Sequence, residues 1–194
     1  MHAALSPPVT PITTARLTLR PYLSTDEAAF FAVLSQNRHR LEPAFPARVA
    51  AVQTSADAAR LLVQFAQEWR TGRLYVFGIW QHDTAAYLGD ISLRPSWQVP
   101  ISAEIGYYLA AEAEGHGYAR EALAATVQFG FGKYLQAHHL TLRCRRDNPR
   151  SIAVAEAVGF QPVVPTRRRL WPLRSKEPEI VHYRLDPSGS MDRG

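Results

Sequence analysis

The sequence contains a single cysteine, Cys144, among 194 residues. It can therefore form no intramolecular disulfide and no cysteine-based zinc cluster. Cys144 follows Leu140 and Leu142 in an apolar alternation, which indicates a buried strand residue, with a nucleophilic cysteine as the open alternative. No apolar run approaches the roughly 18 residues of a transmembrane helix, so we expect no membrane span.

Residues 1–14 contain three prolines and neither lysine nor arginine. They lack the charged start and apolar block of a signal peptide, and we expect a cytoplasmic protein. Hydrophobic residues make up 46% of the chain and charged residues 20%, the mix of an ordinary folded protein. The length suits one domain with a full core better than two.

Acidic residues are scarce between Leu140 and Lys176, in a chain with a formal net charge of +5. From Leu140 to Lys176 only Asp147 and Glu156 oppose the basic residues Arg143, Arg145, Arg146, Arg150, Arg167, Arg168, Arg169, Arg174 and Lys176. Such a field attracts polyanions, for which the candidates are the phosphates of a nucleotide cofactor, an acidic protein, and nucleic acid. A merely solvated basic surface is the alternative.

Two further classes are disfavoured by what the sequence lacks. A nucleic-acid-binding module is disfavoured, because the aromatic residues are dispersed in core-like patterns and no known nucleic-acid-binding motif is present. Histidines and carboxylates do not pair at ligand spacing, so we expect no metal.

Hydrophobic periodicity predicts a mixed α/β (α+β) domain. We expect strands at Arg16–Tyr22, Leu74–Trp80, Ala86–Leu93, Ala103–Leu109, Leu140–Cys144, Phe160–Val164 and Ile180–Leu185. We expect helices near 24–36, 54–71, 117–134 and 148–158, with a loop of at most one helical turn over 37–53. This gives one domain over 14–186, a twisted mixed sheet of about seven strands with about four helices on its faces. A flexible extension at 1–13 and a disordered tail at 187–194 complete the chain.

Capping signals locate several helix ends. Ser24 and Glu27 have the spacing of a capping box, and residues 54–57 begin the next helix. Asn148 caps the last helix, with Pro149 at its first position and Gly159 at its end.

The residues that indicate a binding function run from Glu104 to Leu123, where a strand leads through a short polar loop into a helix. The first amides of a helix have no internal partners, and the helix dipole adds positive potential, so this junction is an anion site. Gly115 and Gly117 let the backbone approach a phosphate without a Cβ in the way. Arg120 adds a charged donor one turn into the helix.

Two common phosphate-binding motifs are absent. The chain has no P-loop sequence, since residues 129–133 have the wrong spacing and lie late in a helix. A dinucleotide-binding fingerprint would need glycine or alanine at Arg120 and an acidic residue about 20 positions further on. Between Ala122 and Arg146 there is no Asp or Glu.

Residues 114–119, Glu-Gly-His-Gly-Tyr-Ala, resemble the acetyl-CoA pyrophosphate loop of the GNAT superfamily, Gln/Arg-x-x-Gly-x-Gly/Ala. Residues 103–109 resemble its central strand, and 147–160 its Asn-x-x-Ser…Gly-Phe helix. The start at 14–20 and the loop at 37–45 resemble the RimJ/RimL-like (ribosomal-protein N-acetyltransferase) branch. The resemblance covers roughly residues 13–185 in the expected order.

The resemblance implies transfer of acetyl from acetyl-CoA to a primary amine by direct attack on the thioester. The expected acceptor is a protein N-terminal α-amine, such as that of a ribosomal protein. A small amine (an amino acid, polyamine or antibiotic) is the alternative, and a fold that binds CoA without catalysis stays open. Because relatives are often monomers or dimers, we expect a monomer or a homodimer.

The resemblance also implies roles for individual residues. Glu104 is the expected base, with Glu42 second, and Ser151 is the expected acid near the sulfur. The amide of Tyr108 or Leu109 would donate to the thioester carbonyl. The expected cofactor-binding residues are Tyr107, Tyr108, Leu109, Glu114, Gly115, His116, Gly117, Tyr118, Ala119, Arg120, Asn148 and Ser151. The expected acceptor-side residues are Glu42, Phe45 and Glu104.

The sequence departs from the family pattern at Glu114, where Gln or Arg is usual. An acid facing a pyrophosphate would repel it, so we expect this side chain to point to solvent and only its backbone to serve. The arginine-rich segment 165–178 and the absence of tryptophan from residues 41–45 leave the acceptor open.

Overall fold

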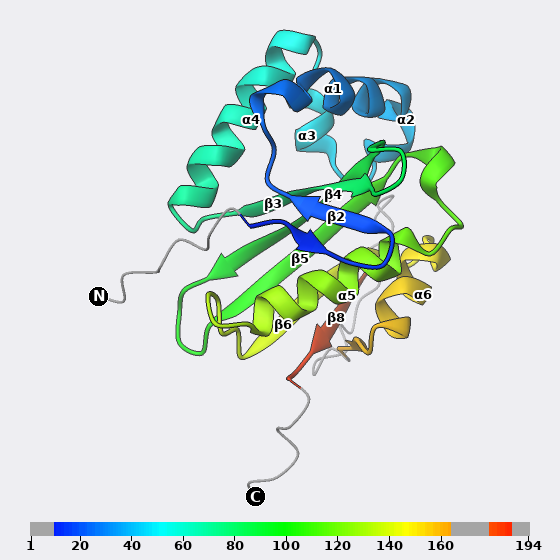
Figure 1. The fold of residues 1–194 in the computed structure, drawn as a ribbon. Coiled ribbons are helices and arrows are strands. Elements are labelled where there is room, and N and C mark those ends of the chain that lie inside the picture. The colour runs from blue at the N-terminus through cyan, green and yellow to red at the C-terminus, as the bar shows by residue number, and fades with distance from the viewer. Residues whose placement is uncertain (1–9, 164–178, 188–194) are drawn as a thin grey trace, which may run out of the picture.

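The computed structural model describes residues 10–163 and 179–187. Their strands form one sheet in the order β1-β2-β3-β4-β5-β6-β8-β7 (Figure 1). The strands are β1 (Ile12–Thr13), β2 (Leu17–Arg20), β3 (Tyr75–Gln81), β4 (Tyr87–Ser96), β5 (Ser102–Leu109), β6 (His139–Arg145), β7 (Gln161–Pro162) and β8 (Ile180–Leu185). The helices are α1 (Glu27–Gln36), α2 (Arg38–Leu41), α3 (Pro46–Ala51), α4 (Ser55–Arg70), α5 (Tyr118–Phe131) and α6 (Pro149–Ala157), with 3₁₀ turns at Ser24–Asp26 and Ala111–Ala113.

The sheet is mixed because one connection crosses over. Neighbouring strands are antiparallel except β5 and β6, which are parallel and are joined through α5. Parallel neighbours require such a crossover connection, usually a helix. The expected single mixed α/β domain is confirmed, with eight strands and six α-helices in the described part rather than about seven and four.

Three local expectations are wrong. Ile12 and Thr13 pair with β2, so the sheet begins inside the extension expected over residues 1–13. Residues 37–53 form α2 and α3 rather than a loop with one turn. Ser24 is not the cap of the first helix: the carboxylate of Asp26 accepts from the amide of Leu23 at 2.7 Å, and a 3₁₀ turn precedes α1.

The expected break after β4 begins later than the sequence indicates. β4 continues through Pro95, which pairs with Ala103 of β5. Its pairing with β3 ends at Leu93, so Pro95 lies where β4 has become an edge strand on that side. A proline, which lacks the N–H, is tolerated at such an edge.

The other two helix starts agree with their signals. Thr54 Oγ1 accepts from the amide of Asp57 at the start of α4. Asn148 Oδ1 accepts from the amide of Ser151 at 3.1 Å, and Pro149 is the first residue of α6. The Asn148 cap holds the start of α6 in a fixed place beside β6.

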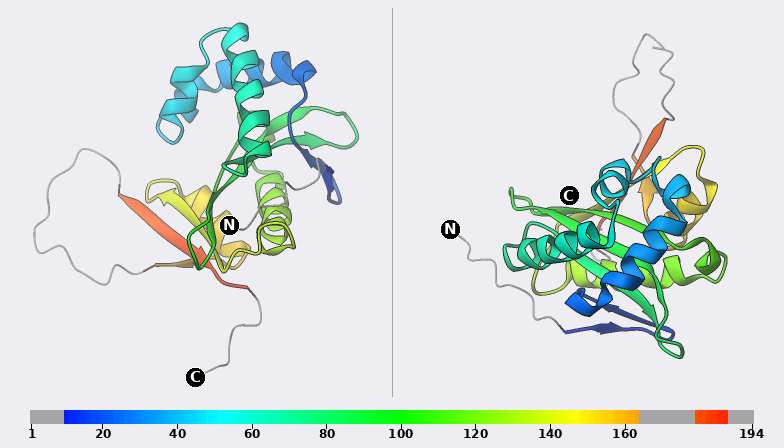
Figure 2. Two further views of the ribbon diagram at one scale, coloured as in Figure 1. Left: turned by 90° about the vertical axis from the view of Figure 1, so that its left-hand side faces the viewer. Right: turned by 90° about the horizontal axis from the view of Figure 1, so that it is seen from above.

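The helices divide into two groups around the sheet. Helices α1 to α4 gather at one end, while α5 lies along the sheet with α6 beside it (Figures 1 and 2). An aromatic cluster joins the groups: the ring of Trp69 on α4 lies 4.9 Å from Phe77 of β3, whose ring lies 5.1 Å from Phe129 of α5. The two groups therefore share one core.

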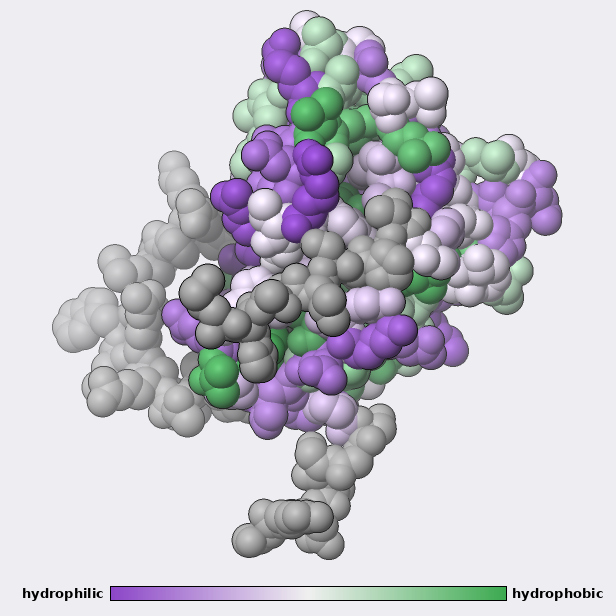
Figure 3. All heavy atoms as spheres, turned by 60° about the vertical axis from the view of Figure 1, so that its left-hand side comes forward, coloured by the Kyte–Doolittle hydropathy of each residue, from purple (hydrophilic) through white to green (hydrophobic). Residues whose placement is uncertain are grey.

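On the face shown in Figure 3, hydrophobic residues form small separate patches among hydrophilic ones. The exposed large hydrophobic residues come from several segments, among them those of Leu23, Val63 and Val99. Within residues 10–163 and 179–187, no helix has the length and apolar character to cross a bilayer.

Candidate active site

The central strand β5 separates from its parallel neighbour. Its pairing with β4 runs to Leu109 opposite Gly89, but its pairing with β6 ends at Ile105 opposite Leu142. Beyond Ile105, no described strand pairs with this edge of β5. The polar backbone groups of residues 106–109 on that edge are therefore available to a ligand.

The direction of the amides selects one of the two expected carbonyl donors. The amide of Ala110 donates to the carbonyl of Leu88 at 2.8 Å, on the β4 side. Successive residues of an extended strand face opposite sides, so the amide of Leu109 faces the gap and that of Tyr108 faces β4. The carbonyl of Leu109 also faces the gap, where it accepts from Arg40 at 3.1 Å.

A left-handed glycine pair follows the strand. Gly115 has φ +82° and Gly117 φ +80°, a region that residues with a Cβ rarely adopt. An added Cβ at Gly115 would meet nothing within 4 Å, so the loop presents open backbone there. Gly117 is the N-cap of α5, and the first-turn amides lie directly behind the loop. This cradle fits a phosphate group.

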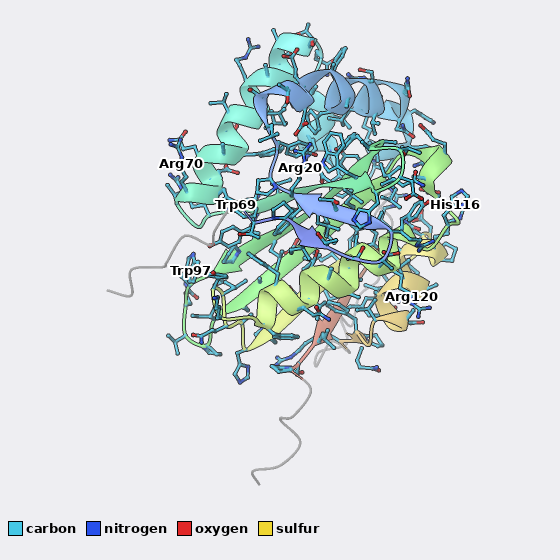
Figure 4. The ribbon with its side chains drawn as sticks, viewed as in Figure 1. Arg20, Trp69, Arg70, Trp97, His116 and Arg120 are labelled. Atoms are coloured by element: carbon cyan, nitrogen blue, oxygen red, sulfur yellow. The ribbon has the colours of Figure 1, made fainter. Side chains whose placement is uncertain are left out.

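The gap and the glycine loop open into one cavity of about 1050 Å³. Of the expected residues, the following line it: Phe45, Glu104, Tyr107, Tyr108, Leu109, Glu114, Gly115, Gly117, Tyr118, Ala119, Arg120, Asn148 and Ser151. His116 and Arg120 lie at the end of the molecule where α5 and α6 begin (Figure 4). The sequence thus identified one continuous surface drawn from β5, the loop, α5 and α6.

Two expected residues are not brought to this cavity. Glu42 is exposed at the end of α2, where its amide donates to the carbonyl of Arg38, and its side chain is not part of the cavity wall. His116 is also exposed, and its ring lies 5.7 Å from that of Tyr118. The arginine-rich segment 165–178, expected near the acceptor, lies outside the described residues.

Glu114 does not point freely to solvent, and that expectation is wrong. Its carboxylate accepts from Arg40 at 2.8 Å and from Arg150 at 2.5 Å. Arg40 comes from α2 and Arg150 from α6, and all three residues line the cavity. The two arginines neutralise the acid, which removes the repulsion that a lone carboxylate would exert on a phosphate.

The side chains of Tyr107 and Ser151 meet across the gap. The Tyr107 hydroxyl lies 3.2 Å from Ser151 Oγ, which lies 3.3 Å from Cys144 Sγ. Burial raises the pKa of Tyr107 to about 12, so its phenol is protonated at neutral pH. Burial also raises the pKa of Cys144, a buried strand residue as expected, and a protonated thiol is a poor nucleophile.

Glu104 lies on the cavity wall in an ion pair with Arg143 of β6, at 2.6 Å. Both side chains are about half exposed, so water reaches the carboxylate. The pair fixes the direction of Glu104 without removing it from solvent.

The wall opposite the glycine loop is built by α2 and α3. Asn37 Oδ1 accepts from the amide of Ala111 at 2.9 Å, which ties the start of α2 to the end of β5. Phe45 packs against Tyr108 with ring centroids 5.6 Å apart. Below it, Arg48 of α3 forms an ion pair at 2.5 Å with Asp90 of β4, whose side chain is 1% exposed.

A buried hydrogen-bond network continues from this pair. Tyr22 donates to Asp90 at 3.0 Å and lies 2.6 Å from the hydroxyl of Tyr87, which in turn lies 3.1 Å from that of Tyr108. Burial raises the pKa of all three tyrosines, which stay neutral. The network connects the wall built by α2 and α3 to the central strand.

Sequence reasoning missed Arg40, Asp90 and Arg48. Arg40 and Arg48 lie in the segment for which no element was expected, and Asp90 lies inside an apolar strand. The one signal in the sequence was Asp90, since a charged residue within a buried strand requires a partner.

The fold and the open strand define an acyltransferase of the acetyltransferase class. The family model described as "Acetyltransferase (GNAT) domain" matches residues 16–161, and the chain belongs to this family of acetyl-CoA-dependent acyltransferases. No described group of three or more His, Cys, Asp or Glu residues could hold a metal ion.

Individual relatives agree with this assignment. The chain is 28% identical over 152 residues to "Uncharacterized N-acetyltransferase YoaA" of Bacillus subtilis (strain 168), covering 76% of this chain and 81% of that protein. The structure is similar to the ribosomal-protein-S5-alanine acetyltransferase of Vibrio fischeri, with a TM-score of 0.78, 20% identity and coverage of 93% and 98%. It is also similar to Mycobacterium smegmatis RimJ in complex with CoA-disulfide, with a TM-score of 0.75, 22% identity and coverage of 99% and 93%.

Proposed function

We propose that this protein transfers the acetyl group of acetyl-CoA to a protein N-terminal α-amine, as a RimJ/RimL-like enzyme. The supporting observation is the continuity of one cavity from the glycine loop, past the open edge of β5, to the wall formed by α2 and α3. A donor and an acceptor amine entering from its two ends would meet beside β5. The similarity in fold to solved ribosomal-protein acetyltransferases supports the peptide acceptor.

The cofactor end of the cavity suits the phosphates of CoA. The amides at the start of α5 and the backbone at Gly115 and Gly117 would hold the pyrophosphate. Arg120 and Arg150 add positive charge at the rim. Asn148, besides capping α6, would contact the pantetheine arm.

The chemistry beside β5 needs three groups from this chain. Glu104 would take a proton from the acceptor ammonium, directly or through water, and the neutral amine so formed would attack the thioester carbonyl. The amide of Leu109 would stabilise the negative charge that develops on the carbonyl oxygen. As the new carbon–nitrogen bond forms and the carbon–sulfur bond of the thioester breaks, Ser151 would donate a proton to the sulfur of the departing CoA.

Thiol release from acetyl-CoA, measured with a panel of acceptors, tests this function. The panel contains ribosomal-protein N-terminal peptides, the same peptides with blocked N-termini, amino acids, polyamines and aminoglycosides. Release that depends on a free peptide N-terminus supports the proposal, whereas release with small amines alone assigns a small-molecule acceptor. Binding of acetyl-CoA without release by any acceptor would indicate a CoA-binding fold without this catalysis.

A further inference from the structure

Arg16, in the turn between β1 and β2, contacts the glycine loop from behind. Its Nη1 donates to the carbonyl of His116 at 2.9 Å, and its guanidinium carbon lies 4.7 Å from the centre of the Tyr118 ring. A Cβ added at Gly117 would lie 3.5 Å from its Nη2. Arg16 thus contacts the residues on both sides of Gly117.

This contact lies on the side away from the large cavity. Arg16 lines a separate cavity of about 570 Å³ together with Glu121 and Ala157, and it does not line the large cavity. Gly117 and Arg120 line both cavities, which are therefore neighbours. Arg16 is therefore not placed to touch a ligand in the large cavity itself.

The contact fixes the orientation of one peptide group. In a planar trans peptide the C=O and the N–H point in opposite directions. Because the His116 carbonyl is held towards Arg16, the amide of Gly117 points away from Arg16. A rotated His116–Gly117 peptide would instead turn a carbonyl, the negative end of the peptide dipole, towards a bound anion.

Glu121, in the first turn of α5, holds Arg16 in place. Its Oε2 accepts from Arg16 Nε at 2.8 Å, and its Oε1 accepts from the Arg16 amide at 2.8 Å and from Thr14 Oγ1 at 2.6 Å. Burial acts to raise the pKa of Glu121, but the hydrogen bonds from Thr14 and Arg16 outweigh it and the pKa is lowered. The carboxylate therefore stays charged and keeps the guanidinium fixed.

We infer that Arg16, anchored by Glu121, is a positioning residue that orients the His116–Gly117 peptide for binding the pyrophosphate of acetyl-CoA. The inference rests on the proposed use of the glycine loop as the pyrophosphate site and adds a residue behind that loop. The Arg16 side chain is about half exposed, so its ion pair adds little to overall stability. We expect the loss of Arg16 to lower the affinity for the cofactor instead.

The test compares Arg16→Gln with the unmodified protein, using CoA and two acetyl donors. Isothermal titration with CoA should show a Kd raised about tenfold or more, the loss expected when one hydrogen bond to a charged group is misplaced. Turnover with acetyl-CoA should show a raised KM and little change in kcat. Turnover with S-acetylpantetheine, which has no pyrophosphate, should change less than twofold. Arg16→Lys, which keeps the charge and can still donate to one carbonyl, should restore part of the affinity.

Arg60→Gln is the matched control, because Arg60 is an exposed arginine paired with Asp57 on α4. It removes the same charge and should leave the Kd for CoA unchanged. An unchanged Kd in Arg16→Gln, or equal losses with acetyl-CoA and S-acetylpantetheine, overturns the inference. An unmodified protein that binds no CoA overturns the proposed function, and this inference with it.

Discussion

The phenolic oxygen of Tyr107 lies 3.2 Å from Oγ of Ser151. Tyr107 comes from β5 and Ser151 from α6, so this contact crosses the gap in which the open strand edge lies. Since the pKa of Tyr107 is raised to about 12, the phenol can donate to Ser151 at neutral pH. The Ser151 proton is then directed elsewhere, which is the arrangement that a proton donor to a leaving sulfur needs.

Ser151→Ala should lower kcat by about 10² while leaving the KM for acetyl-CoA within twofold, the scale of a lost general acid. The start of α6 should be unaffected, because Asn148 caps it through the Ser151 amide and not through the hydroxyl. Steady-state kinetics with the peptide acceptor provide the measurement. Ser151→Thr keeps a hydroxyl and should retain most of the rate; equal loss in both variants would show that packing, not the hydroxyl, is required.

Glu104→Ala should lower the rate most at low pH, where free amine is scarce and a base is needed most. The measurement is kcat/KM for the acceptor between about pH 6 and about pH 9. This range lies around the pH of about 5 to 8 at which proteins are usually most stable. Arg143→Gln is the matched control, since it breaks the same ion pair but keeps the carboxylate. If both variants show the same profile, the ion pair matters for structure and Glu104 is not the base.

Glu114→Gln should tighten CoA binding several-fold at low salt, because it leaves the positive charges of Arg40 and Arg150 without the carboxylate that neutralises them; one such charge is worth about 1 kcal/mol at 4 Å from an anion in water. The gain should shrink at high ionic strength. Titration calorimetry at two salt concentrations measures it, with Glu112→Gln as the control, since Glu112 is exposed and does not line the cavity. Weaker binding would mean instead that Glu114 is needed to hold Arg40 and Arg150 in place.

The parts of the site that depend on neighbours in sequence could be predicted. Asn148 and Ser151 are three residues apart and meet through the cap of α6. Gly115 and Gly117 adopt the left-handed backbone that their type permits, at the junction where a helix begins. Such local rules act before tertiary contacts and can be recognised in a single sequence.

The parts that depend on distant contacts could not be predicted. Arg40 and Glu114 are 74 positions apart, and only the fold brings α2 to the glycine loop. Residues 37–53 have no clear hydrophobic period because α2 and α3 are short. Arg38 holds the end of this segment by donating to the carbonyls of Val49 and Val52. Tertiary contacts thus decide the structure there, and periodicity does not record them.

Asp90→Asn should destabilise the protein by about 3–5 kcal/mol, the cost of leaving one member of a buried ion pair unpaired. The change leaves Arg48, whose side chain is 13% exposed, without its charged partner, and it removes the charged acceptor of Tyr22. Urea unfolding followed by circular dichroism gives the measurement. The double variant Arg48→Met with Asp90→Leu should recover much of this loss; no recovery would mean that the tyrosines, and not the arginine, need Asp90.

Tyr107→Phe should reduce the loss of stability at alkaline pH. The pKa of Tyr107 is about 12 in the folded protein, against 10.0 for an ordinary tyrosine. Above pH 10 the unfolded chain gives up this proton while the folded chain keeps it, so the unfolded state binds fewer protons and stability falls as pH rises towards 12. Below pH 10 both states are protonated and this contribution is constant. The effect is at most about 2–3 kcal/mol, from 1.4 kcal/mol per pKa unit.

Urea unfolding of both proteins at about pH 8.5 and about pH 11, which lie below and above the ordinary tyrosine pKa of about 10, measures this difference. The unmodified protein should lose more stability between the two pH values than Tyr107→Phe does. Tyr22, Tyr87 and Tyr108 also have raised pKa values but are present in both proteins, so their contribution cancels in the comparison. Equal losses in the two proteins would mean that the Tyr107 phenol ionises as readily in the folded state as in the unfolded chain. It would then be a weaker candidate for holding the Ser151 hydroxyl in place.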